Sequence, residues 1–194
     1  FLSAGAVVAE THTRNIEDHG GLIKYMPHTA FFFLIGAMAI SALPPFNGFF
    51  SEWLTFQTLF QGIMTLDSAT KWIFIAGAGA LAFSGGLALF CFVKVFGAVF
   101  LARPRGKEVP QAKESGRSLQ IAMGVLAFLS IAVGVGSGYV VSFFEKVGNS
   151  FGSLKHAPEA TMLSSGQTLV APHGFATVSA PHILVFFAIA FLMI

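Results

Sequence analysis

The chain has 194 residues, of which 55% are hydrophobic and only 10% are charged, with a formal net charge of +2. Soluble globular domains carry about 25% charged residues, so this composition excludes an ordinary soluble domain and indicates an integral membrane protein. The few positive charges gather in one segment, so they indicate membrane topology and do not support a nucleic-acid partner. The single cysteine, Cys91, excludes an internal disulfide and leaves no Cys/His ligand set, so we expect no metal site.

The first part of the chain predicts a helix end, a loop and an interrupted helix. Residues 1–9 are apolar and lack the basic flank and cleavage site of a signal peptide, so we expect the end of a transmembrane helix that starts earlier. Residues 10–27 form a polar loop. The apolar stretch 28–62 is too long for one straight crossing, because about 20 residues span a bilayer core. Pro44, Pro45, Asn47 and Gly48 predict a break in it at residues 44–48.

The second part of the chain predicts two clear transmembrane helices. Residues 72–101 and 119–144 are both long enough to span a bilayer with some tilt. The remaining segments are a basic loop at 103–118, a Gly-, Ser- and Thr-rich loop at 145–181, and the start of a further transmembrane helix at 182–194. The sequence therefore predicts an all-α, polytopic transmembrane helix bundle.

Loop charges bear on whether residues 28–62 cross the membrane once or form a hairpin. The basic loop contains Arg103, Arg105, Lys107, Lys113 and Arg117, whereas the loop at 145–181 has only Lys146 and Lys155. By the positive-inside rule the basic loop is cytoplasmic and the later loop extracytoplasmic. A single crossing also places the 10–27 loop, with its two basic residues, on the cytoplasmic side, whereas a hairpin places it opposite the basic loop. We therefore favour one discontinuous transmembrane helix over a hairpin.

Glu52 is the only charge in the apolar stretch from Ala30 to Leu66, and it follows the proline pair. A carboxylate in lipid costs about 2.5 kcal/mol or more on insertion scales, so it needs a pore, a partner or a proton. Irregular backbone at membrane depth is tolerated beside water, and the start of the second half-helix favours an ionised carboxylate. We therefore predict that Glu52 takes up and releases protons; the alternative is a glutamate at an interfacial helix end.

Two further residues are weaker candidates for proton translocation. Lys94 lies about 10 Å of helix from the basic loop, so it can snorkel to the headgroups or act as a cytoplasmic-side partner on a proton path. His12 lies in the polar loop, and histidine as a residue type exchanges protons near neutral pH. A solvated loop histidine is the simpler interpretation of His12. The other histidines, including His156, His173 and His182, lack metal-ligand spacing.

Several apparent motifs have no functional context. The glycines of residues 77–82 match a dinucleotide pattern but lie within an apolar span, without a preceding strand. Gly134 and Gly138 have the spacing that allows close helix packing. Residues 164–166 lack an acid/base set, so we predict no catalytic centre.

Four stretches of the chain resemble a known family. Residues 20–27 (GGLIKYMP), 33–37 (FLIGA) and 42–53 (ALPPFNGFFSEW) are similar to the antiporter-like proton-channel subunits of respiratory complex I, Mrp antiporters and membrane-bound hydrogenases. Together with residues 88–97 (ALFCFVKVFG), they most resemble the hydrogenase-4 and formate hydrogenlyase branch. The resemblance is clear up to about residue 107. It implies two inverted repeats, each with one broken helix, of which this chain holds the second.

The resemblance implies a role for Glu52 and a set of partners. Glu52 matches the exit-side ionisable residue of the second repeat, and a basic residue is often found in the family at the place of Lys94. The implied function is redox-driven proton translocation within a multi-subunit complex of the bacterial inner membrane, with H⁺ and Na⁺ both open as the transported ion. Nickel-iron, iron–sulfur and flavin centres then belong to partner subunits. The alternatives are a cation/proton antiporter subunit of the Mrp type and a membrane scaffold without transport.

Overall fold

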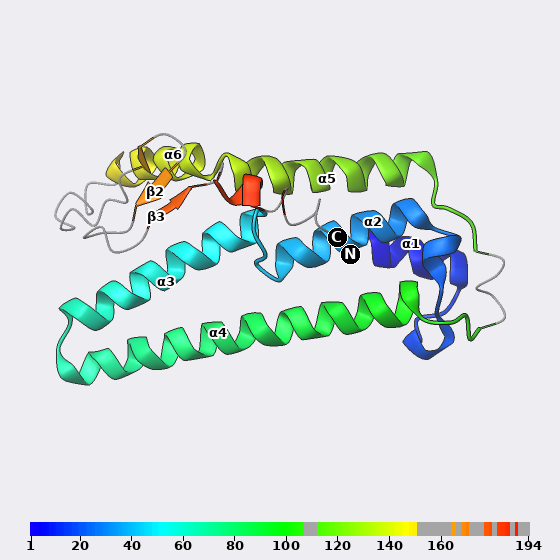
Figure 1. The fold of residues 1–194 in the computed structure, drawn as a ribbon, viewed down its shortest axis with the longest axis horizontal. Helices are drawn as coiled ribbons and strands as arrows, with labels where there is room; N and C mark the ends of the chain where they lie inside the picture. Colours follow the sequence, from blue (N-terminus) through cyan, green and yellow to red (C-terminus); the bar gives the residue numbers. More distant parts are fainter. Residues whose placement is uncertain are drawn as a thin grey trace. The chain divides into compact units, whose positions relative to one another are not determined.

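The computed structural model describes residues 1–106, 112–150, 164–165, 168–170, 177–179, 182–186 and 189. Helices dominate this part of the chain, in the order drawn in Figure 1. The chain divides into two compact units: Phe1–Ser41 with Ser84–Leu129, and Ala42–Phe83 with Ser130–Ile194. The predicted all-α bundle is confirmed, with three short strands as an addition.

The first unit is built from four helical segments at the start of the chain and three that return to them. The early segments are α1 (Leu2–Thr11), η1 (Ile16–Asp18), η2 (Leu22–Lys24) and α2 (Pro27–Ile40). The returning segments are the second part of α4 (Ser68–Phe96), the π-helical turn η3 (Gly97–Leu101) and the first part of α5 (Arg117–Val135). Pro27 occupies the first turn of α2, where its missing N–H has no helical partner to lose.

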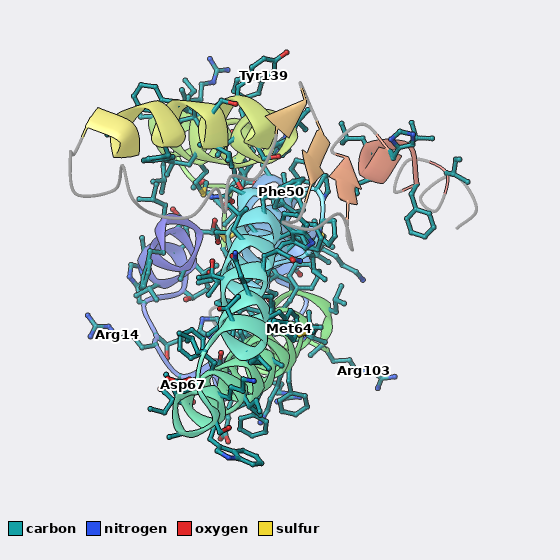
Figure 2. The ribbon with its side chains drawn as sticks, turned by 90° about the vertical axis from the view of Figure 1, so that its left-hand side faces the viewer. Arg14, Phe50, Met64, Asp67, Arg103 and Tyr139 are labelled. Atoms are coloured by element: carbon teal, nitrogen blue, oxygen red, sulfur yellow. The ribbon has the colours of Figure 1, made fainter. Side chains whose placement is uncertain are left out.

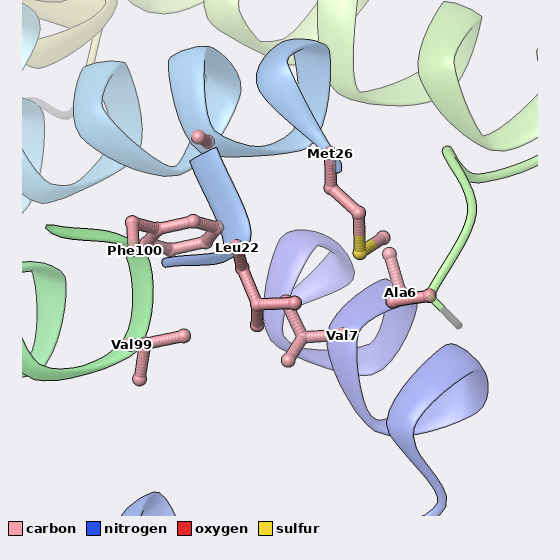
Figure 3. Packing of buried hydrophobic residues seen from close by; sticks show 8 residues of the cluster. Ala6, Val7, Leu22, Met26, Val99 and Phe100 are labelled. Carbon is pink, nitrogen blue, oxygen red and sulfur yellow. The ribbon is translucent and has the colours of Figure 1, made fainter. Parts of the chain in front are cut away.

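The core of this unit gathers side chains from α1, η2 and η3. Leu22, Met26 and Phe100 are fully buried there, and Figure 3 shows them converging with Val7 of α1. Phe33 of α2 contacts the ring of Phe100 with centroids 5.3 Å apart. The polar segment 10–27 is therefore folded against the end of the α4–η3 helix.

Two glycines allow this loop to lie directly on the chain that follows η3. Gly20 has φ +150°, and a Cβ there would collide with the carbonyl of Arg103. Gly21 has φ +68°, a left-handed conformation that glycine adopts without steric cost. The N–H of Gly106 donates to the carbonyl of Asp18 at 2.9 Å. The first residues of the basic segment are thus fixed to the 10–27 loop through their backbones.

The second unit contains α3 (Asn47–Thr65), the first part of α4, and α6 (Ser137–Ser150). α3 and α4 are joined by a short turn, marked in Figure 2 by Met64 and Asp67, and lie side by side in Figure 1. Gly62 leaves no room for a Cβ beside the ring of Phe74, so the two helices approach closely at this point.

The structure differs from the predicted 119–144 helix, because α5 ends at Val135 and α6 begins at Ser137. The residue between them, Gly136, donates its N–H to the carbonyl of Ala132 at 2.8 Å. Glycine is a weak helix former, so Gly134 and Gly136 together lower the helical preference of this stretch. The apolar composition of 119–144 predicts helical residues but not this division.

Short strands occur within the segment predicted as a long loop. β1 (Ser164–Ser165), β2 (Thr168–Val170) and β3 (Thr177–Ser179) pair antiparallel in that order, with Leu169 opposite Val178. β-Branched residues favour such pairing. α6 also continues beyond the predicted loop boundary at residue 145, and residues 182–186 are helical.

Two helices of the described chain are long and apolar enough to cross a membrane. They are Ser68–Leu101, with a mean hydropathy of 2.0, and Arg117–Val135, with 2.1. α1 and α2 are shorter apolar helices. The first long helix contains the predicted crossing at 72–101 and begins four residues earlier.

Candidate functional site: a carboxylate after a helix interruption

The helical path is interrupted between α2 and α3. α2 ends at Ile40, and the next residues include Ala42 in a left-handed conformation with φ 51°. Pro44 and Pro45 follow, and neither can donate a helical hydrogen bond. α3 then begins at Asn47, so Asn47 and Gly48 lie in its first turn and not in the interruption, contrary to the expectation for these two residues. One discontinuous crossing made of α2 and α3 stays a prediction.

The end of α5 packs tightly against the start of α3 within the second unit. Ser130 donates its hydroxyl to Oδ1 of Asn47 at 2.8 Å. A Cβ on Gly134 would collide with the carbonyl oxygen of Pro45 and would stand 2.9 Å from the nitrogen of Asn47. The close packing predicted for Gly134 thus occurs against the residues that begin α3.

Glu52 lies in the second turn of α3 and is half-buried. Phe50 lies on the opposite side of the helix, where it is buried and packs against Trp53, Val141 and Ile183. Figure 2 shows Phe50 beneath α6. Within the described residues, no hydrogen bond or ion pair engages the Glu52 carboxylate. This carboxylate is therefore available to water, to a proton or to a group outside the described chain.

Glu52 shares a helix face with residues that contact α4. It lies seven positions before Leu59, so the two occupy nearly the same face of α3. Leu59 is 3.4 Å from the Cβ position of Gly77. Glu52 therefore lies on nearly the same face of α3 as Leu59, which contacts α4 in the second unit.

A row of hydroxyl groups runs along another face of α3, and the sequence analysis missed it. Ser51, Thr55, Thr58 and Thr65 follow Asn47 at helical spacing, and all are exposed. Each hydroxyl donates to a carbonyl three or four residues earlier, at 2.9–3.1 Å. The four side chains are exposed, so each oxygen can accept a further hydrogen bond, and Gly62, on the same face between Thr58 and Thr65, packs on Phe74 of α4. The periodicity of Ser and Thr in residues 47–65 was the available signal.

Lys94 and His12 are distant from Glu52 in the sequence and belong to other helical elements. Lys94 is exposed on the last turns of α4. His12 is exposed and ends α1 in a left-handed conformation, with its N–H donating to the carbonyl of Val8. Both residues belong to the first unit, whereas Glu52 belongs to the second. Their predicted roles in proton translocation stay predictions.

A second polar cluster forms around Glu114, which the sequence analysis did not single out. One carboxylate oxygen accepts the N–H of His28 at 2.9 Å, and the other accepts the hydroxyl of Thr29 at 2.6 Å. Nδ1 of His28 lies 3.3 Å from the first oxygen, and the N–H of Ser115 lies 3.2 Å from the second. Partial burial raises the pKa of Glu114, but these hydrogen bonds lower it more, so its pKa lies below the ordinary value.

The described residues contain no group of three or more His, Cys, Asp or Glu side chains that could hold a metal ion. Cys91 is exposed on α4, and His156 and His173 lie outside the described residues. The arrangement offers a half-buried carboxylate, a hydroxyl row and a polar cluster, all suited to exchanging protons with water.

Comparison with known proteins identifies the family of the first part of the chain. Residues 1–80 match the family described as NADH:quinone oxidoreductase/Mrp antiporter, TM. These residues belong to that family. The predicted family resemblance is confirmed, and the matched segment includes α1, α2, the interruption and Glu52.

Two relatives and one solved structure extend the likeness beyond the part matched by the family. Hydrogenase-4 component B of Escherichia coli K12 is 38% identical over 98% of this chain and 28% of its own length. Formate hydrogenlyase subunit 3 of the same organism is 36% identical over 73% of this chain and 23% of its own length. The membrane-bound sulfane sulfur reductase, an archaeal respiratory membrane complex, shares the fold, with a TM-score of 0.68, 24% identity, and coverage of 99% of this chain and 29% of that one. The chain thus spans under a third of each protein.

Proposed function

We propose that this chain is part of a proton-translocating membrane subunit of a redox-driven respiratory complex of the hydrogenase-4 or formate hydrogenlyase type. The observation that carries the proposal is Glu52, a half-buried carboxylate directly after a helix interruption, without a partner among the described residues. Ionisable residues within apolar segments line proton relays far more often than they face lipid. The membrane subunits named among its relatives support the same function.

The chain would contribute electrostatics and no bond-making chemistry. Water reaching the interruption hydrates Glu52, and the hydroxyl row of α3 offers lone pairs along which water can line up. A charge change elsewhere in the complex shifts the balance between the ionised and protonated carboxylate. Glu52 then takes up a proton and releases it as the neighbouring charge returns.

Partners and location follow from this function. The nickel-iron, iron–sulfur or flavin centres that supply electrons belong to partner subunits. The full protein resides in a bacterial inner membrane, with the basic segment 103–118 on the cytoplasmic side. H⁺ is the favoured transported ion, and Na⁺ is the alternative.

The test uses the full-length protein in its complex, in inside-out membrane vesicles supplied with the electron donor. Acidification of the vesicle interior should accompany electron transfer, and Glu52→Ala should abolish it while the complex stays assembled. Retained acidification in Glu52→Ala would refute the proposal. A cation/proton antiporter of the Mrp type is the second candidate, since the matched family includes such proteins. It predicts proton movement driven by a Na⁺ gradient without any electron donor.

A further inference from the structure

The polar cluster at the start of α2 combines an exposed imidazole with a fixed carboxylate. The His28 side chain is 67% exposed and the Glu114 side chain 22%. Nδ1 of His28 lies 3.3 Å from Oε2 of Glu114, so with a proton on Nδ1 the imidazole donates to the carboxylate. The other ring nitrogen, Nε2, is then the basic atom of an exposed side chain. This geometry suits the capture of a proton from water.

The Glu114 carboxylate is held in place by the first turn of α2. The N–H groups of His28 and Thr29 and the hydroxyl of Thr29 all donate to it, although Glu114 lies 86 and 85 residues further along the chain. The start of a helix carries partial positive charge, which favours an ionised carboxylate. Because Glu114 is stabilised in its ionised form, it acts as a permanent counter-charge and not as the proton carrier.

The two oxygens of Glu114 face different surroundings. Oε2 meets the exposed His28, whereas Oε1 meets Thr29, which is fully buried. The hydroxyl of Ser115, also buried, lies 3.2 Å from that of Thr29. The cluster therefore connects the water-exposed side of α2 to hydroxyl groups inside the first unit.

We propose that His28 and Glu114 form a proton-collecting pair at the loop end of α2, on the side that the basic segment assigns to the cytoplasm. The imidazole binds a proton from water at Nε2, and the carboxylate balances the charge of the imidazolium. This proposal rests on the proposed function, because a collecting group serves a subunit that moves protons. His28 is the group that binds the proton, and Glu114 is a positioning and charge-balancing residue.

Other charged groups lie on the elements around this pair. They are Glu10 at the end of α1, Lys24 in η2, Lys94 on α4, Arg103 after η3, and Lys113 and Arg117 on either side of Glu114. The Glu10 carboxylate accepts the N–H of Lys113. Of these, none makes a hydrogen bond or ion pair with the His28 imidazole within the described residues. Among the described residues, Glu114 is therefore the carboxylate in contact with the His28 imidazole.

The first experiment compares the pH profile of proton translocation between the wild-type complex and His28→Asn. Asparagine keeps an amide donor for Glu114 but cannot bind a proton. We expect equal rates when the cytoplasmic-side medium is acidic and a rate lower by about threefold or more when it is alkaline, because scarce protons then limit uptake. A profile that superimposes on the wild type, or a loss independent of pH, overturns the proposal. Glu17→Gln, an exposed acid of the same unit, is the matched control.

The second measurement does not depend on translocation. Diethyl pyrocarbonate modifies neutral imidazole, so the rate of His28 modification against pH, read by mass spectrometry on the purified full-length protein, reports its protonation. In Glu114→Gln we expect modification of His28 at a given pH to be faster than in the wild type by about threefold or more, since the side chain that contacts Nδ1 no longer carries a charge. An equal rate overturns the proposal. If Glu52→Ala abolishes translocation while both His28 measurements are negative, the proposed function stands and the collecting pair alone fails.

Discussion

Gly134 gives the clearest structural test of how the start of α3 is held. A Cβ at Gly134 would collide with the carbonyl of Pro45 and stand 2.8 Å from the carbonyl carbon of Phe46 and 2.9 Å from the nitrogen of Asn47. All three are backbone atoms, so no side chain can rotate away. Gly134→Ala must therefore push α5 and the beginning of α3 apart.

The expected magnitude combines three effects. Overpacking costs about 1–3 kcal/mol, and loss of the Ser130–Asn47 hydrogen bond costs about 1 kcal/mol. Alanine in place of glycine within a helix returns about 1 kcal/mol. The net loss is about 1–3 kcal/mol. Local opening of α3 should become more frequent by about 5- to 150-fold.

Hydrogen exchange on the full-length protein measures this opening at the amides in the second turn of α3. The matched control is Gly86→Ala, because nothing lies within 4 Å of a Cβ at Gly86 in α4. Gly86→Ala should leave exchange in α3 unchanged. If Gly134→Ala also leaves it unchanged, or slows it, the packing of α5 on the start of α3 is refuted.

Four further substitutions have defined outcomes. Pro44→Ala should restore helical preference at the interruption and impair proton translocation in vesicles, and full activity would count against a functional interruption. Gly62→Ala should lower the apparent melting temperature, because its Cβ meets the ring of Phe74. Gly77→Ala should be tolerated, because its Cβ would lie at an ordinary contact distance of 3.4 Å from Leu59. If Gly77→Ala lowers the melting temperature as much as Gly62→Ala does, the close approach of Gly62 to Phe74 is refuted. Glu114→Ala should destabilise α2 by about 1–2 kcal/mol at neutral pH. Because the folded-state pKa of Glu114 is lowered, the ionised carboxylate contributes its full stabilisation when the pH is above the ordinary pKa. This stabilisation is lost as the pH falls through the folded-state pKa, so the stabilities of wild type and variant should converge in acid. A difference in stability that stays constant with pH would contradict this.

Local chemistry made parts of the fold predictable from the sequence. Proline cannot donate a helical hydrogen bond, so Pro27, Pro44 and Pro45 mark the start of α2 and the interruption after it. Apolar runs of sufficient length identify α4 and α5. The break at Gly136 escaped prediction, because glycines also occur inside α4 without ending it.

Contacts between distant residues could not be predicted in the same way. Glu114 appears in the sequence as one of two acids within a basic segment, and nothing local indicates that its carboxylate binds His28 and Thr29 in the first turn of α2. The same holds for Gly134, whose spacing to Gly138 indicates close packing without naming the residues of Pro45 to Asn47 as the contact. The role of Glu52 rests on the family resemblance and on its position, and it stays a prediction.

The number of protons moved per electron in the complex carrying Glu52→Gln tests the central claim most directly. Glutamine preserves the size and hydrogen-bonding capacity of Glu52 but cannot release a proton. We predict that the assembled variant complex still transfers electrons when the proton gradient is collapsed, and that it moves fewer protons per electron than the wild type. An unchanged ratio would contradict a proton-relay role for Glu52 and would favour a scaffold.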